Sequence, residues 1–140
     1  MAARILVVED DDLTRDLFVM VLTRIGGYDA EATGDLDEVV RLVSEGGIGL
    51  VLMDVSLTQG WLNGGEMNGV ALTRMLKDDP KTRGVPVILI SAFANPSEAV
   101  IMLKESGADD YIAKPVTDFQ VLVGKVGSLL TNPPRKRGES

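Results

Sequence analysis

The sequence predicts one α/β domain, a doubly wound, five-stranded parallel sheet with helices on both faces. Short apolar runs alternate with stretches of helical periodicity along most of the chain, and such alternation typically builds a parallel sheet. Three of the runs are apolar at every position, as expected for strands that are buried on both faces. The length of 140 residues suits a single domain of this kind.

The first half of the chain predicts three strands and two helices. The run 5–8 is wholly apolar and precedes a helix that ends at Gly26-Gly27. Residues 28–32 alternate weakly as a second strand, and a short helix follows that stops at Gly46-Gly47. The run 50–53 is again wholly apolar and predicts the third strand. The apolar residues expected to form the core-facing sides of the two helices are Leu13, Leu17, Met20, Val21, Ile25, Leu36, Val39, Val40 and Val43.

The second half repeats the pattern. Residues 70–77 have helical spacing, and the wholly apolar run 87–90 predicts the fourth strand. Pro96 suits the first position of the next helix, whose apolar face is expected to be Val100, Ile101 and Leu103. A short strand over 111–113 and a helix over 119–130 complete the domain, which is expected to span 1–130. Residues 131–140, rich in proline and basic side chains, are expected to be a disordered tail.

Composition excludes several kinds of site. The chain contains no cysteine and no histidine, which excludes disulfides, thiolate chemistry and a Ser-His-Asp triad. Its net charge of −7 disfavours phosphate contacts, so we expect no nucleic-acid partner. No apolar run approaches the length of a membrane-spanning helix, and the N-terminus does not resemble a signal peptide. We therefore expect a cytoplasmic protein without a membrane partner.

Polar side chains follow four of the predicted strands. Glu9 and Asp10 follow the first strand, Asp54 the third, Ser91 the fourth and Lys114 the fifth. The carboxyl ends of parallel strands share one edge of the sheet, so these residues are expected to meet there. Clustered carboxylates are costly without a cation, and oxygen ligands suit Mg²⁺. With a lysine and a hydroxyl beside them, they predict a site for a phosphoryl group.

Four stretches at strand ends occur in an order that is typical of one known family. They are Ile5-Leu6-Val7-Val8-Glu9-Asp10-Asp11, Val51-Leu52-Met53-Asp54, Ile88-Leu89-Ile90-Ser91-Ala92 and Gly107-Ala108-Asp109-Asp110-Tyr111-Ile112-Ala113-Lys114-Pro115. With them the chain resembles the receiver domain of bacterial response regulators, the CheY-like superfamily of two-component signal transduction. The resemblance covers about residues 3–130 and implies a flavodoxin-like (βα)5 receiver fold in a phosphorelay. We expect a stand-alone receiver whose output is contact with a downstream protein, and not a classical turnover enzyme.

The resemblance also implies how the phosphoryl group arrives. Asp54 would be the phosphoacceptor, and the donor would be a phosphohistidine on a sensor histidine kinase or a histidine phosphotransfer protein. Asp10 and Asp54 would bind Mg²⁺, or Mn²⁺, directly together with the backbone carbonyl of Ser56. Glu9 would assist through water.

Three further roles follow from the same resemblance. Lys114 would pair with phosphoryl oxygens. The switch residues would be Ser91 and Tyr111. Ser91 would bond the phosphoryl group, and Tyr111 would swing inward in response. The Lys114-Pro115 bond would be cis, and the switching surface would be built from the fourth helix, fifth strand and fifth helix.

The loop after Asp54 departs from the family pattern. The Asn68-Gly69 pair that fits the start of the third helix lies farther from Asp54 than is typical. The added stretch contains Trp61, and it is either a recognition or lid element or an inserted loop that packs on the body of the domain. Phe93 either borders the site entrance or simply lines the surface. Asp109-Asp110 are expected to lie in a solvated turn.

Two alternatives to a phosphorylated receiver stay open. In a phosphatase of the haloacid-dehalogenase type, Asp10 would be the nucleophile and Asp12 the acid/base. The position of Asp109-Asp110 before Lys114, and the lack of a role for Asp54, count against that alternative. The second alternative is a pseudo-receiver, an interaction module that works without phosphorylation.

Overall fold

The computed structural model describes residues 4–55, 61–62, 65–66, 68–92, 95–114 and 116–131. The five predicted strands form one parallel sheet in the order β2-β1-β3-β6-β7, which confirms the doubly wound fold. This order is the flavodoxin-like arrangement of a five-stranded sheet. The strands are β1 (Arg4–Val8), β2 (Asp29–Thr33), β3 (Ile48–Asp54), β6 (Val87–Ser91) and β7 (Asp110–Ala113).

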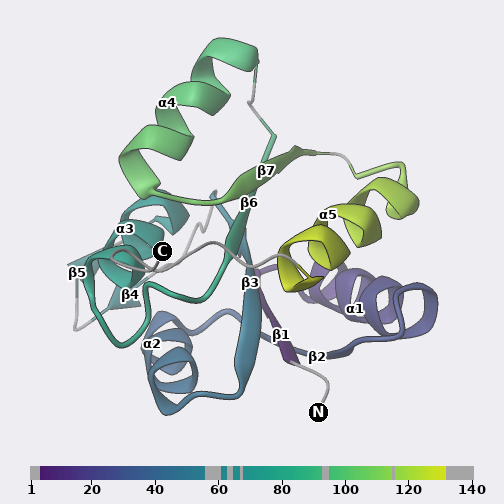
Figure 1. The fold of residues 1–140 in the computed structure, drawn as a ribbon, viewed down its shortest axis with the longest axis horizontal. Coiled ribbons are helices and arrows are strands. Elements are labelled where there is room, and N and C mark those ends of the chain that lie inside the picture. Colours follow the sequence, from purple (N-terminus) through teal and green to yellow (C-terminus); the bar gives the residue numbers. More distant parts are fainter. Residues whose placement is uncertain are drawn as a thin grey trace.

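Helices cover both faces of the sheet (Figure 1). α1 and α5 pack on one face, α2 and α3 pack on the other, and α4 lies beside α3 and β7. Among these helices, α1 passes directly into η1, a π-helical turn. The helices are α1 (Asp12–Met20), η1 (Val21–Ile25), α2 (Leu36–Glu45), α3 (Gly69–Asp78), α4 (Pro96–Ser106) and α5 (Phe119–Thr131).

Short polar side chains start four of these helices. Each of these side chains accepts a hydrogen bond from a backbone N–H in the first turn of its helix: Asp11 in α1, Asp35 in α2, Asn68 in α3 and Asn95 in α4. Such caps satisfy N–H groups that have no partner within the helix. The predicted helix start at Pro96 is confirmed, because Asn95 caps α4 immediately before it.

The central strands are buried on both faces because their apolar side chains alternate between two cores. Leu6, Val51 and Leu89 belong to the core beneath α2 and α3. Their strand neighbours Val7 and Leu52 belong to the core beneath α1 and α5. Burial on both sides explains why these strands are wholly apolar in sequence.

The predicted core face of α1 is partly wrong. Leu13 is 80% exposed, and Leu17, Met20 and Ile25 are also exposed. The buried positions are Phe18, Val21 and Leu22, so of the five predicted residues Val21 alone is buried. Phe18, Val21 and Leu22 have the spacing of one helical face themselves, so the sheet covers the face beside the one that Leu13 and Leu17 occupy.

The predicted face of α4 is also partly wrong. Val100 and Ile101 are exposed, whereas Ala99 and Ser106 are buried. α4 packs against α3 and the edge strand β7, and Val100 and Ile101 lie on the side of the helix that these neighbours leave uncovered. Two of its three expected core residues are left at the surface.

The stretch after β3 contains a feature that sequence did not predict. β4 (Trp61–Leu62) and β5 (Gly65–Glu66) pair antiparallel as a small hairpin, and β4 lies next to α2. The side chain of Trp61 lies outside the described residues, as do Phe93 and residues 132–140 of the predicted tail 131–140. No helix in the described part of the chain is long and apolar enough to span a membrane.

Candidate functional site

The candidate site lies where the order of the strands reverses. β1 pairs with β2 on one side and with β3 on the other, and both pairings are parallel. The connections to α1 and α3 leave the same edge of the sheet on opposite faces (Figure 1). Ligands of doubly wound sheets bind in the crevice at such a reversal. This position brings Glu9 and Asp10, after β1, next to Asp54 at the end of β3.

Three carboxylates meet at this edge. Glu9, Asp10 and Asp54 each present a carboxylate oxygen, and these oxygens lie within 4.8 Å of one another. Glu9 and Asp54 are buried, with side chains 4% and 3% exposed, and Asp10 is half-buried. A compact set of oxygen donors, partly open to water, fits the chemistry of Mg²⁺, which keeps several water ligands. The three acids therefore lie close together in the fold, as predicted from the sequence.

Lys114 places a positive charge against two of the carboxylates. Its Nζ lies 3.3 Å from Asp54 Oδ1 and 3.5 Å from Glu9 Oε2. Burial alone would lower the pKa of Lys114, but the attraction of Asp54 and Glu9 raises it above its usual value. Lys114 is therefore a fixed cation in the site, and it can neutralise an oxygen of an incoming phosphoryl group.

Glu9 holds its proton more tightly than an ordinary glutamate. Burial of its carboxyl group raises its pKa from 4.5 to about 7. The neighbouring carboxylate of Asp54 acts in the same direction, and Lys114 opposes the shift. A group with a pKa near neutrality changes charge within the physiological range. In the absence of a cation, the acidic cluster therefore takes up part of a proton near pH 7.

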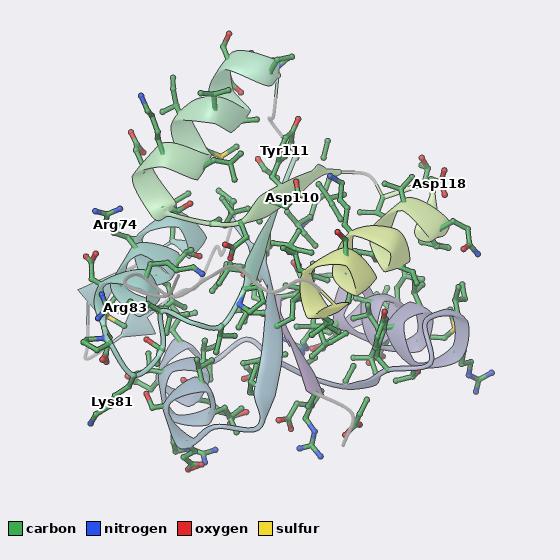
Figure 2. The ribbon with its side chains drawn as sticks, viewed as in Figure 1. Arg74, Lys81, Arg83, Asp110, Tyr111 and Asp118 are labelled. Carbon is green, nitrogen blue, oxygen red and sulfur yellow. The ribbon has the colours of Figure 1, made fainter. Side chains whose placement is uncertain are left out.

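The other predicted site residues lie in different surroundings. Ser91 ends β6 and is buried, and its carbonyl accepts a hydrogen bond from the backbone N–H of Lys114. Tyr111 lies on β7 beside α4, half-buried against the core (Figure 2). Ser56 and Pro115 lie outside the described residues, so the predicted carbonyl ligand and the cis peptide bond stay predictions.

Asp12 does not join the acidic cluster. Its side chain is 85% exposed and forms an ion pair with Arg15. The phosphatase alternative needs Asp12 as an acid/base beside Asp10. This placement counts against that alternative.

Gly69, at the start of α3, allows a close approach to Asp54. A Cβ atom at this position would collide with the backbone oxygen of Asp54 and would lie 3.0 Å from Cα of Val55. Backbone atoms cannot move aside as a flexible side chain can, so a larger residue would displace the end of β3. The predicted role of Asn68-Gly69 in opening α3 is confirmed, since Asn68 caps the helix.

Three polar residues were missed or misjudged from sequence. Arg15 donates from Nη1 to the carbonyl of Glu9 at 2.8 Å, next to the acidic cluster. Its position three residues after Asp12 on a helix was the available signal. Asp109, expected in a solvated turn, instead accepts hydrogen bonds from Lys77 Nζ and the Val87 N–H. Asp110 is likewise not in a turn, because it begins β7 and pairs with Lys125.

Comparison with known proteins settles the family. The family model described as the response regulator receiver domain matches residues 5–126 of this chain. The chain belongs to the response regulator receiver domain family. Receiver domains are modules of bacterial two-component signalling, as the relatives below illustrate.

One relative of this receiver corrects an expectation drawn from charge. It is 37% identical over 115 residues to the "DNA-binding response regulator MtrA" of Mycolicibacterium smegmatis, a match that covers 82% of this chain and 45% of that protein. The chain spans about half the length of the curated relatives it matches. The prediction of no nucleic-acid partner, made from the net charge, is therefore wrong, because a relative that this chain matches is described as a DNA-binding response regulator.

Solved structures share the fold of this receiver. The signal receiver domain of a histidine kinase from Syntrophus aciditrophicus is 34% identical, with a TM-score of 0.77 and coverage of 99% of this chain and 98% of that one. The receiver domain of the sensor histidine kinase PA1611 from Pseudomonas aeruginosa is 25% identical, with a TM-score of 0.70 and coverage of 94% and 96%. That structure is described as having a magnesium ion coordinated in the active site cleft.

Proposed function

We propose that this receiver accepts a phosphoryl group on the carboxylate of Asp54 in a reaction that requires Mg²⁺ or Mn²⁺. The observation that carries the proposal is the buried Asp54 carboxylate, which lies among two other carboxylates and 3.3 Å from Lys114 Nζ. The donor is a phosphohistidine of a sensor histidine kinase or a histidine phosphotransfer protein. An oxygen of Asp54 attacks phosphorus, the phosphorus–nitrogen bond breaks, and the histidine leaves as the acyl phosphate forms.

Each neighbour of Asp54 has a role in the proposal. Asp10 and Asp54 would hold the cation directly, together with the Ser56 carbonyl, and Glu9 would act through a water of the cation. The bound cation neutralises charge on phosphoryl oxygens. Lys114 neutralises another of these oxygens, since its Nζ already lies against Asp54. The magnesium ion described in the PA1611 receiver domain supports the assignment of the acidic residues.

The output of the proposed switch is a change in a protein-binding surface. We place this surface on α4, β7 and α5, where Val100, Ile101 and Val121 are exposed apolar side chains. Tyr111 and Asp110 lie on β7 between these helices (Figure 2). In the proposal, Ser91 moves to bond the phosphoryl group, Tyr111 follows inward, and the surface shifts between two states.

The experiment that tests the proposal is intact mass spectrometry after incubation with acetyl phosphate and Mg²⁺. Wild-type protein should gain one phosphoryl group only when Mg²⁺ is present, and Asp54→Ala should gain none. Asp10→Ala should be labelled much more slowly. Asp16→Asn is the matched control, because Asp16 is an exposed acid on α1 outside the cluster.

Two outcomes would contradict the proposal in different ways. Labelling that persists in Asp54→Ala and disappears in Asp10→Ala would move the nucleophile to β1 and favour the phosphatase class. A wild-type protein that is not labelled, and is not bound by the phosphoryl analogue beryllium fluoride, would favour the pseudo-receiver.

A further inference from the structure

We propose that Arg15 is a positioning residue for the acidic cluster. Its guanidinium holds the loop that carries Asp10 in the geometry that binds a divalent cation. This inference rests on the proposed function, because it concerns the cation that the phosphoryl reaction requires.

The guanidinium of Arg15 ties the loop that carries Asp10 to the start of α1. Nη1 donates a hydrogen bond to the backbone carbonyl of Glu9, before Asp10 in the chain, at 2.8 Å. Nη2 forms an ion pair with the carboxylate of Asp12, the first residue of α1. Asp10 lies between Glu9 and this helix start, so the Arg15 side chain fixes the backbone just before Asp10 relative to α1. The planar fork of an arginine can make two such bonds at once, whereas a lysine ammonium acts as a point charge.

Close packing against Gly34 is a second and independent observation. A Cβ atom at Gly34 would lie 3.1 Å from Arg15 Nη1, 3.3 Å from Cα of Asp10 and 3.3 Å from the carbonyl oxygen of Glu9. Arg15, the loop and residue 34 at the end of β2 are therefore in tight contact. The Arg15 side chain is only 24% exposed, which fits a guanidinium held in place and not one extended into solvent.

The charge of Arg15 allows its positioning role to be separated from an electrostatic one. A positive charge near a cation site opposes binding of the cation by Coulomb repulsion. If Arg15 acted through its charge alone, its neutralisation would tighten Mg²⁺ binding. If Arg15 orders the loop, its loss weakens Mg²⁺ binding despite the removed repulsion. The two roles thus predict changes of opposite sign in one measured constant.

The test is an NMR titration of isotope-labelled protein with MgCl₂, which gives a dissociation constant for Mg²⁺. We expect Arg15→Gln to raise this constant by about tenfold, the loss typical when a residue that orients a metal ligand is removed. Arg24→Gln is the matched control, because it removes the same charge from the exposed far end of the same helical segment. It should leave the constant unchanged or slightly lower.

A second variant and a second readout separate local ordering from general damage. Arg15→Lys keeps the charge but lacks the fork, so it should also bind Mg²⁺ more weakly than wild type. In metal-free protein, hydrogen exchange of the amides of residues 9–12 should be faster in both Arg15 variants than in Arg24→Gln. A urea unfolding curve for each variant establishes that the measured protein is folded.

The outcomes distinguish this inference from the proposed function. A wild-type protein that binds Mg²⁺ and is labelled by acetyl phosphate, together with an Arg15→Gln protein that binds Mg²⁺ equally or more tightly, overturns the inference alone. An Arg15→Lys protein identical to wild type in Mg²⁺ binding and in loop exchange also overturns it. A wild-type protein that neither binds Mg²⁺ nor is labelled overturns both.

Discussion

The buried carboxyl group of Glu9 makes the stability of the metal-free protein depend on pH in a defined direction. Its pKa is about 7 in the folded protein and near 4.5 for an ordinary glutamate. Between these two values the folded state binds more protons than the unfolded state, so the unfolding free energy falls as the pH rises. Between about pH 5 and about pH 8, this difference in pKa lowers the free energy of unfolding by about 2.5 kcal/mol.

The measurement is urea unfolding of wild type and Glu9→Gln at both pH values, in buffer with a metal chelator. Glutamine keeps the shape of the side chain and cannot titrate, so subtracting its pH dependence removes the contribution of all other groups. Relative to Glu9→Gln, wild-type protein should lose stability as the pH rises, and the loss should level off above about pH 7.

Two results of this experiment would refute the reasoning. A stability difference between the two proteins that is the same at both pH values would show that Glu9 has an ordinary pKa in the folded state. A difference that changes in favour of wild type as the pH rises would show that Lys114 outweighs burial in setting the charge of Glu9. Protons and the cation compete for these carboxylates, so saturating Mg²⁺ should flatten the pH dependence.

Two further predictions concern stability away from the acidic cluster. Asp109→Ala should lower the unfolding free energy by about 2–4 kcal/mol, because it removes the carboxylate that pairs with the partly buried ammonium of Lys77 and leaves the Val87 N–H without its acceptor. Asp78→Ala, at an exposed pair, should cost under about 1 kcal/mol in the same urea experiment, and equal costs would contradict this account. Gly127→Ala should raise the melting temperature less than Gly124→Ala does, because a Cβ at Gly127 would lie 2.9 Å from the Tyr28 hydroxyl, whereas a Cβ at Gly124 meets nothing within 4 Å. The added change Tyr28→Phe should remove most of this difference, and equal melting temperatures of the two single variants would argue against the clash.

The strands and helix starts could be predicted from sequence because their causes are local. A wholly apolar run such as 50–53 suits a strand buried on both faces, and β3 covers it. Asn95 before Pro96 provides a cap and a suitable first residue, and α4 starts there. These features depend on residues within one turn or one strand.

The residues that meet at the candidate site could be predicted for a topological reason. Parallel strands end at one edge, so Asp10, Asp54 and Lys114 had to lie near that edge. Sequence alone did not give the 3.3 Å approach of Lys114 to Asp54 or the raised pKa of Glu9. Both depend on burial by segments that are distant in the chain, which local pattern does not report.

The sequence by itself determined the order of strands and helices, the caps and the residues that gather at one edge of the sheet. Tertiary structure alone decided which side of each helix is buried. Helical spacing groups Leu13 with Leu17, yet Phe18 is the residue of α1 that enters the core. Spacing reports which side chains share a face, whereas the neighbours in space determine which face is covered. For the same reason Asp109 became part of a buried ion pair with Lys77, a partner that lies 32 residues away in the chain.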